Sequence, residues 1–392
     1  MSELAILGGP KVIPDGALTY WPAPGARHVD AIARAVHSGK FHRVNHPSVL
    51  EFEAELETHA GASARATGSG TAAVQIALQA MTEPTDTVVV PAYNWPGAVG
   101  PIAALGRSIR FVDVDPKTAC VSDEEVSRLG PHETLVVTHL FGNWPSGADA
   151  PDAVAPNVLH DCAQAFGAVA SLGRRGAHVI VSGNGAKHLA AGELGALVGP
   201  RRIVDAVDRV SLTSSSRNGE RMFSPNTLGF NFRPNVFSAA IAAQRVREFN
   251  EDIQVRRGNA SYLLGRLSEC DLIEPLVDVD SHDKNSYLDL AFRFHPAGSS
   301  DGRLRDLFVE ALIAEGVPAS VWLREPVWKY MPHVRDDDLS SFPETKRILA
   351  EQFHITEVGS PNGLREMSLI ADAFEKVVGA LPRLLAQRNV HA

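Results

Sequence analysis

Short apolar runs that alternate with helical segments constrain the fold of this chain more than any other feature. From Ala64 onward the runs read ARAT, DTVVVPA, IRFVDVD, TLVVTHLFG, NVLHDCAQAFGA and HVIVSG, and helical stretches such as TAAVQIALQAM and PGAVGPIAALG lie between them. Nearly continuous apolar runs are typical of strands buried on both faces, and the helices supply the crossovers of a parallel sheet. The pattern predicts an α/β fold whose large domain holds a mostly parallel sheet.

The segments on either side of this pattern predict two further parts. Residues 1–25 are rich in glycine and proline, which interrupt helices, and are expected to form an extended arm. A long helical stretch beginning VFSAAIAAQRVREF leads out of the sheet pattern into mixed strand-like and helical segments. We therefore expect a large domain over residues 26–245 and a smaller C-terminal α+β domain over residues 246–392.

Composition excludes several classes of protein. The formal net charge is -9 and no long Lys/Arg cluster occurs, so we expect no binding to nucleic acid. Cys120, Cys162 and Cys270 are widely spaced without a CxxC pair, so neither a disulfide nor a metal site is expected. The N-terminus lacks a basic segment followed by an apolar one, and no apolar run approaches the length of a membrane span. We expect a cytoplasmic protein that does not bind a membrane.

Ligands of parallel sheets bind beyond the carboxyl ends of the strands, so the residues there are candidates for a site. Gly68 to Thr71 lie where a strand turns into a helix, and free backbone N–H groups at a helix start suit an anion. A simple turn with an N-cap explains these residues equally well. Trp95 follows the next strand and suits stacking on a flat ring, although an aromatic there also suits core packing.

An acid and a lysine follow later strands in an order that suggests one cofactor. Asp161, with Gln164 close behind it, ends the run NVLH, where a carboxylate is costly unless a cation pairs with it. Lys187 follows Ser182 and stands among small residues, in VSGNGAKHLAAGELGALVG, which leave room beside its amine. A lysine in a confined site attacks carbonyls, whereas an isolated lysine is usually only solvated. Phosphate cradle, stacking aromatic, acid and lysine together match pyridoxal phosphate.

These residues resemble a known family. The chain is similar to the DegT/DnrJ/EryC1/StrS aminotransferases, which are fold type I pyridoxal-phosphate enzymes that aminate keto-sugars and keto-cyclitols. The resemblance rests on LGGPKVIP, FEAELETHAGASARATGSGTAAVQIAL, VVVPAYNWPGAV, HDCAQAFGA, SGNGAKHLAAGELGA and LGFNFRPNVFSAAIAAQ. It implies a fold type I aminotransferase-like architecture over most of the chain.

The resemblance also implies roles for individual residues. Lys187 would form the Schiff base with the cofactor, and Asp161 would keep the pyridine nitrogen protonated. Gln164 would sit beside the ring and its 3-hydroxyl, and Trp95 would stack on its face. The remaining cofactor-binding positions would be those that hold the phosphate: Gly70, Thr71, Ser182 and, reaching in from a second subunit, Asn231. A homodimer with shared active sites follows from the last position.

The expected activity is transfer of an amino group from glutamate or glutamine to a ketone of a sugar, cyclitol or related small molecule, in natural-product (antibiotic) biosynthesis. Three departures from the family pattern, at His160, Gly183 and Leu194, lie near the lysine and leave the substrate open. A dehydratase of the same family would carry histidine in place of Lys187, whereas here His188 follows the lysine. An aminohydroxybenzoate-synthase-like lyase and a non-catalytic binding protein on this scaffold remain alternatives.

Overall fold

The computed structural model describes residues 3–42, 46–211, 214–217, 220–223, 230–296, 302–331, 334 and 336–387. Residues 211, 214–217, 220–223 and 387 are described by their backbone alone.

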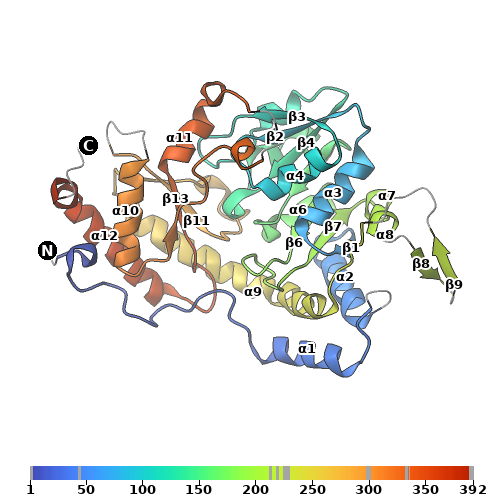
Figure 1. The fold of residues 1–392 in the computed structure, drawn as a ribbon. Coiled ribbons are helices and arrows are strands. Elements are labelled where there is room, and N and C mark those ends of the chain that lie inside the picture. The colour runs from blue at the N-terminus through green and yellow to red at the C-terminus, as the bar shows by residue number, and fades with distance from the viewer. Residues whose placement is uncertain are drawn as a thin grey trace.

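A seven-stranded sheet forms the centre of the larger lobe (Figure 1). Its strand order is β1-β7-β6-β5-β4-β2-β3, and every neighbouring pair is parallel except the two pairs that β7 makes with β1 and β6. The strands are β1 Ser63–Thr67, β2 Thr87–Pro91, β3 Ser108–Val112, β4 Glu133–Thr138, β5 Val158–Asp161, β6 His178–Ser182 and β7 Gly195–Gly199. The predicted, mostly parallel sheet is confirmed.

Helices cover both faces of this sheet, as the continuous apolar strands require. Along β6, Val179 and Val181 pack into one apolar cluster while Ile180 packs into another on the opposite face. The first face is covered by α2 Pro47–Ala60, α6 Val169–Arg174 and α9 Val236–Leu267. The second face is covered by α3 Gly70–Met81, α4 Pro96–Ala104, α7 Arg201–Val204 and α8 Ala206–Ser211.

The antiparallel strand β7 was not anticipated from the sequence. Its residues, Gly195 to Gly199, are too few and too rich in glycine to show a strand pattern. A Cβ at Gly195 would lie 2.3 Å from the carbonyl carbon of Ser69, so only glycine allows β7 to pass this close to the start of α3. A second unanticipated element is the hairpin of β8 Ser214–Arg217 and β9 Glu220–Phe223, which projects from the lobe (Figure 1).

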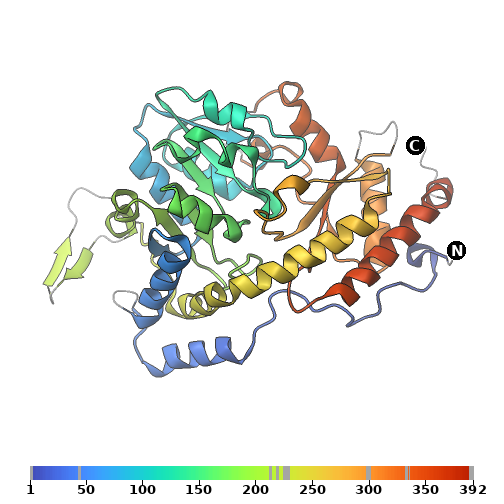
Figure 2. The same ribbon diagram turned by 180° about the vertical axis from the view of Figure 1, so that it is seen from behind.

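The smaller lobe is α+β, as expected. Its antiparallel sheet has the order β10-β11-β13-β12, with β10 Ile273–Pro275, β11 Leu290–Phe294, β12 Ala319–Ser320 and β13 Gln352–Ile355. Its helices are α10 Arg303–Ala314, α11 Pro343–Glu351 and α12 Leu364–Gln387. Helix α9 runs from beside α2 to beside α12 and joins the lobes (Figure 2). The division at residues 245 and 246 falls within α9 and stays a prediction.

The N-terminal segment runs along the smaller lobe before it reaches α1 Ala26–His37 (Figures 1 and 2). Leu4, Ile13 and Leu18 are buried in the same apolar cluster as residues of α10 and α12. The arm is thus anchored to the C-terminal lobe by its apolar side chains. Helices α1 and α2 are followed by Gly39 and Gly61, both left-handed with φ of 62° and 64°, a conformation typical of the residue after a helix.

The remaining elements are short. They are α5 Asp123–Ser127 and the 3-10 helices η1 Ala5–Leu7, η2 Leu140–Gly142, η3 Ser146–Ala148, η4 Pro151–Val154, η5 Phe166–Ala168, η6 Val279–Ser281, η7 Val327–Tyr330 and η8 Leu339–Ser341. In the described part of the chain, no helix has both the length and the apolar character needed to cross a membrane.

Candidate active site

A cavity of about 320 Å³ lies at the carboxyl ends of the parallel strands. Residues that end β4, β5 and β6 line it, together with the first residues of α3 and α4. It contains seven of the eight positions singled out in the sequence: Gly70, Thr71, Trp95, Asp161, Gln164, Ser182 and Lys187. The topology therefore gathers residues that are as far as 117 positions apart in the chain into one site.

The start of α3 provides the anion-binding end of the cavity. Ser69 caps the helix, its hydroxyl accepting a hydrogen bond from the Ala72 N–H at 3.1 Å. The N–H groups of Gly70 and Thr71 belong to the first turn, where a helix has no acceptors of its own. A Cβ at Gly70 would lie 3.0 Å from the Ser182 Cβ, so glycine lets the helix start approach the Ser182 hydroxyl. The cavity is thus lined at one end by three donors, which suits a phosphate.

Two tryptophans from different lobes form an aromatic wall. Trp95 precedes α4 and is 54% exposed, and its ring lies 6.4 Å from that of Trp322 with an angle of 26° between the planes. The backbone N–H of Trp95 donates to the Asn94 side-chain oxygen at 2.8 Å, and the Asn94 amide donates to the Thr138 hydroxyl at 3.0 Å. This chain of hydrogen bonds fixes the Trp95 segment to the end of β4.

Asp161 is the buried acid of the cavity. Burial raises the pKa of its carboxyl to about 6, although the Ala163 N–H bond and the nearby Lys187 ammonium oppose the rise. Oδ1 accepts the Ala163 N–H at 3.0 Å, and Oδ2 accepts no hydrogen bond from the residues that the structure describes. Gln164 accepts the Phe141 N–H at 2.7 Å through Oε1, which leaves its Nε2 as a donor.

Lys187 lies half-buried in a turn of small residues. Burial lowers the pKa of its amine, and the carboxylates of Asp289 and Asp161 only partly offset this. The neutral, nucleophilic form is therefore more accessible than in a solvated lysine. The backbone around it is held by a bond from the Lys187 N–H to the Asn184 carbonyl at 2.9 Å, and the Trp21 indole N–H donates to the Lys187 carbonyl oxygen, also at 2.9 Å.

The acid that the family pattern has before Asp161 is replaced here by a pair of buried histidines. His160 Nε2 lies 2.8 Å from the Ala153 carbonyl oxygen and must donate to it, so His160 Nδ1 accepts from His139 Nε2 at 3.0 Å. Burial lowers the pKa of His160 to about 4 and also holds the pKa of His139 well below its ordinary value. The pair is therefore neutral at physiological pH, so the residue directly before Asp161 in the sequence carries no charge.

Asn231 is the one predicted position outside the cavity. It is exposed, has a left-handed φ of 59°, and lines a separate surface hollow with Phe41 and Arg233. Its prediction concerned the active site of a second subunit, and that role stays a prediction.

Several residues of the cavity were not assigned from the sequence. Asn184 donates through Nδ2 to Glu193 at 3.1 Å, and its backbone N–H donates to the Ser182 hydroxyl at 3.3 Å. Trp322 enters from the smaller lobe. Asn184 and Glu193 lie within the glycine-rich segment around Lys187, which was a usable signal, whereas nothing in the local sequence places Trp322 beside Trp95.

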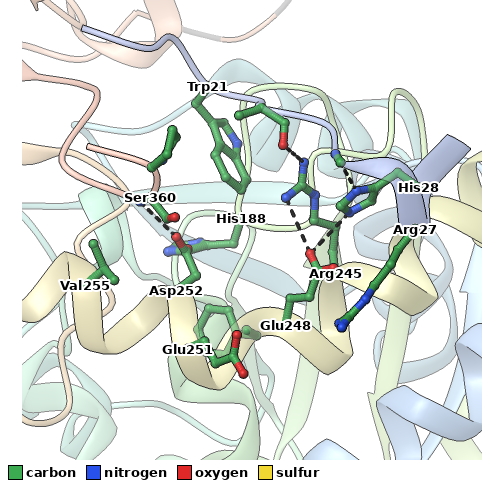
Figure 3. A pocket seen from close by; sticks show the side chains of 14 residues that line it. Trp21, Arg27, His28, His188, Arg245, Glu248, Glu251, Asp252, Val255 and Ser360 are labelled. Carbon is green, nitrogen blue, oxygen red and sulfur yellow. Dashed lines mark hydrogen bonds and ion pairs between the residues drawn. The ribbon is translucent and has the colours of Figure 1, made fainter. Parts of the chain in front are cut away.

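A second and larger cavity, of about 400 Å³, lies below Trp21 between the arm and α9 (Figure 3). Three of the ionisable groups that line it pair with one another. Glu248 lies 3.3 Å from His28 Nε2 and 3.8 Å from Arg245 Nη1, and Arg245 donates to the Ala23 carbonyl at 3.3 Å. His188 lines this cavity and not the first one, since its Nε2 donates to the Ser286 carbonyl at 3.2 Å.

The residues of the first cavity fit pyridoxal phosphate. The first-turn donors of α3 and the Ser182 hydroxyl suit its phosphate, and the free oxygen of Asp161 suits a protonated ring nitrogen. A Cβ at Gly97 would lie 2.8 Å from Trp95 and 2.9 Å from the Thr71 hydroxyl, so glycine keeps open the space between the aromatic wall and the helix start. Lys187 supplies the amine that would hold the cofactor covalently.

Comparison with known proteins identifies relatives of most of the chain. The profile of the DegT/DnrJ/EryC1/StrS aminotransferase family matches residues 23–359. The 3-amino-5-hydroxybenzoate synthase of Amycolatopsis mediterranei is 28% identical over 312 residues, which cover 76% of this chain and 79% of the relative. The L-glutamine:2-deoxy-scyllo-inosose aminotransferase of Streptomyces fradiae is 29% identical over 351 residues, covering 80% and 79%.

Solved structures share the fold. A crystal structure of 3-amino-5-hydroxybenzoic acid synthase superposes with a TM-score of 0.81 at 24% identity, covering 92% of this chain and 98% of that one. The sugar aminotransferase CalS13 from Micromonospora echinospora superposes with a TM-score of 0.76 at 23% identity, covering 93% and 99%.

Proposed function

The chain belongs to the DegT/DnrJ/EryC1/StrS aminotransferase family, and on that premise we propose that it is a pyridoxal-phosphate-dependent aminotransferase that transfers the amino group of glutamine or glutamate to a compact cyclic ketone. The observation that carries the proposal is the cavity at the strand ends, where seven predicted cofactor-binding positions meet. Two of their polar atoms, Asp161 Oδ2 and Gln164 Nε2, make no hydrogen bond with the described residues, and a bound cofactor would supply their partners.

Each residue has a task that follows from its surroundings. Gly70, Thr71 and Ser182 would bind the phosphate, and Trp95 would lie against the ring. Asp161 would favour protonation of the ring nitrogen, since its buried carboxylate is stable only beside a cation. When bound, pyridoxal phosphate withdraws electrons from the carbon that carries the amino group.

Lys187 would act as both anchor and proton carrier. Its lowered pKa lets Nζ be neutral when it binds the cofactor, and a released Nζ beside the substrate carbon can accept and return a proton. The opposing carboxylates of Asp289 and Asp161 keep the protonated form accessible as well. One amine thus serves both halves of a transamination.

The substrates are proposed from the relatives and from the charge of the cavity. Several relatives are named as glutamine-dependent inosose aminotransferases, which supports glutamine as donor and a cyclitol or sugar ketone as acceptor. Among the described residues that line the cavity, Lys187 is the only cation, so a substrate diphosphate would find no arginine there. A role in natural-product biosynthesis follows from the same relatives.

We also propose a homodimer in which Asn231 reaches the phosphate of the partner's active site. The support is its exposed position outside this chain's own cavity, beside the exposed Phe41. Location in the cytoplasm stays a prediction.

The test is an absorption spectrum of the purified protein with pyridoxal phosphate, followed by addition of glutamine or glutamate labelled with ¹⁵N at the α-amino group. We expect a visible band that requires Lys187, its loss when the true donor is added, and release of the matching 2-oxo acid. A candidate cyclitol ketone should then receive the ¹⁵N. A protein that gives no visible band would refute the proposal.

A second candidate is a lyase that forms an aromatic amino acid, favoured by the similarity to 3-amino-5-hydroxybenzoate synthase. Such an enzyme would show the same visible band, but it would need no amino donor. Retention of the visible band after both donors are added would favour it over the aminotransferase.

A further inference from the structure

We propose that Trp21 is a positioning residue for Lys187. Its indole N–H donates to the Lys187 carbonyl oxygen and so holds residues 183–191, the lysine turn, in the orientation that the amine needs. The inference rests on the proposed function, because it concerns the amine that would bind the cofactor. Trp21 lies outside the cofactor cavity, on the opposite side of the lysine turn, so it acts through Lys187 and not on the substrate.

The lysine turn has few side chains of its own to hold it. Residues 183–186 are Gly-Asn-Gly-Ala, and the two residues that follow His188 and Leu189 are alanines. Ala190 has a φ of 34°, a conformation that non-glycine residues adopt only when their surroundings impose it. Leu189 and Ala191 pack into the apolar core, whereas the small residues before Lys187 offer little side-chain packing. The geometry there depends on hydrogen bonds, and the Lys187 carbonyl accepts one from the Ala190 N–H at 3.0 Å and one from Trp21.

Trp21 supplies such a bond from a rigid base. The distance from its Nε1 to the Lys187 carbonyl oxygen is 2.9 Å, and its own backbone N–H donates to the Glu357 carboxylate at 2.7 Å. The guanidinium carbons of Arg245 and Arg256 lie 4.5 Å and 5.1 Å from the centre of the indole ring. Cation-π contacts of this kind, with both arginines buried, restrain the ring.

The side chain after the lysine is anchored on the same side. His188 is buried beside Trp21 in the second cavity and donates to the Ser286 carbonyl (Figure 3). Burial lowers the pKa of His188 to about 3, so the ring is neutral and keeps one N–H for this bond. With the Lys187 carbonyl and the His188 ring both turned toward the second cavity, the Lys187 side chain is directed to the first.

The base on which Trp21 rests belongs to the smaller lobe. Thr19 and Asn362 exchange two hydrogen bonds, of 3.0 and 2.8 Å, which clamp the arm to the loop that also carries Glu357. Trp21 therefore connects the smaller lobe to the lysine turn of the larger lobe. On this proposal, the link lets a segment remote in sequence set the geometry of the amine.

The test uses substitutions that separate the N–H from the ring. Trp21→Phe removes the donor, Trp21→benzothienylalanine removes it while keeping the indole shape, and Trp21→His restores a donor because imidazole Nε2 overlays indole Nε1. Trp144→Phe is the matched control, since Trp144 donates a 2.9 Å indole bond to Asp149 elsewhere in the lobe. The benzothienylalanine variant keeps the test valid where Trp21→Phe folds poorly.

Two readouts do not depend on turnover. One is the visible circular dichroism of the bound cofactor, which reports its fixed orientation, and the other is amide hydrogen exchange of residues 183–191 in the cofactor-free protein. Loss of the N–H should remove most of the dichroism and speed exchange about tenfold. It should also lower kcat about tenfold, with KM for the donor changed less than about twofold.

The outcomes are distinct. Recovery of both signals in Trp21→His, with the Trp144→Phe control unchanged, is the expected result. Wild-type dichroism and exchange in the two donor-free variants would overturn the positioning role, as would equal losses in the control or a folded Trp21→His protein without recovery. A wild-type protein that gives no visible band overturns the proposed function itself, and amide exchange then still reports whether Trp21 holds the turn.

Discussion

The two cavities on either side of the lysine turn differ in a way that volume does not reveal. The one below Trp21 is the larger, about 400 Å³ against about 320 Å³, and in it Glu248 pairs with His28 and Arg245. In the smaller cavity an oxygen of Asp161 and the amide nitrogen of Gln164 have no partner among the described residues. The larger cavity also has buried polar atoms without a hydrogen-bond partner in the described part of the chain, namely His28 Nε2, His188 Nδ1 and Arg245 Nε. The smaller cavity differs in its chemistry, because a helix start, an acid and an amine that together suit one cofactor line it.

Replacement of Lys187 should have the largest effect on activity. A small effect would remove the difference in function between the two cavities. Lys187→Ala removes the amine that would hold the cofactor and move the proton, so we expect transamination to fall at least about 1000-fold. The measurement is the rate of 2-oxo acid release at saturating donor.

Lys284→Ala is the matched control, because that lysine lines neither cavity and makes an exposed pair with Asp149 at 2.9 Å and a cation-π contact with Trp144. Similar losses in both variants would point to a nonspecific effect of losing a lysine. Full activity in Lys187→Ala would remove the smaller cavity as the active site.

The buried carboxyl of Asp161 should make the cofactor-free protein less stable as pH rises. Its pKa is raised from an ordinary 3.8 to about 6 in the folded state, so the folded protein binds more protons than the unfolded chain between these values. Stability attributable to this group is present below about pH 4 and is lost as pH rises to about 6, by at most about 3 kcal/mol.

Denaturant unfolding of the wild type and of Asp161→Asn across this range checks the prediction, since the difference between them isolates the group from other titrations. If the free energies of unfolding of the two proteins changed in parallel with pH, the carboxyl would already be paired inside the protein. Pyridoxal phosphate should reduce the difference by placing a cation opposite the carboxylate.

A substitution in the second cavity should lower the stability of the protein and leave cofactor binding unchanged. Asp252 bonds to the buried Arg256 at 2.6 Å and to the Ser360 N–H at 3.2 Å, so Asp252→Asn leaves the guanidinium short of a negative partner. We expect a loss of about 2 kcal/mol in the free energy of unfolding, with the visible cofactor band retained.

Asp271→Asn, at an exposed position, serves as the control for this change. Loss of the cofactor band in Asp252→Asn, without loss of stability, would contradict the distinction between the cavities.

The sequence predicted the smaller cavity well because its residues follow from local patterns. Apolar runs locate β4, β5 and β6, and the topology of a parallel sheet then brings Asp161, Ser182 and the start of α3 to one edge. The long helix α9 was equally visible in its apolar spacing. These features depend on short-range periodicity and on a general rule of chain topology.

The parts that escaped prediction depend on contacts between distant segments. Strand β7 is recognisable only from its pairing with β1 and β6, and the burial of Leu4 and Ile13 only from the packing of the arm on the smaller lobe. The site residue Trp322 is placed by contacts between the lobes, where its ring meets those of Tyr93, Trp95 and Phe141. Tertiary packing of this kind leaves no local signature in the sequence.

Replacement of Trp322 should therefore have the smallest effect, and it tests a single contact between the smaller lobe and the substrate. Its ring lies 6.4 Å from that of Trp95 and meets Tyr93 and Phe141 edge-on at 5.2 and 5.4 Å. Aromatic pairs of this geometry contribute about 0.5 to 1.5 kcal/mol, so Trp322→Leu should raise KM for the ketone about threefold to tenfold and change kcat little. Trp328→Leu, whose ring packs against Phe111 and Phe342, should instead lower stability and leave KM unchanged. A Trp322→Leu enzyme with unchanged KM would show that the aromatic wall ends at Trp95, and that the smaller lobe closes the site without contacting the substrate.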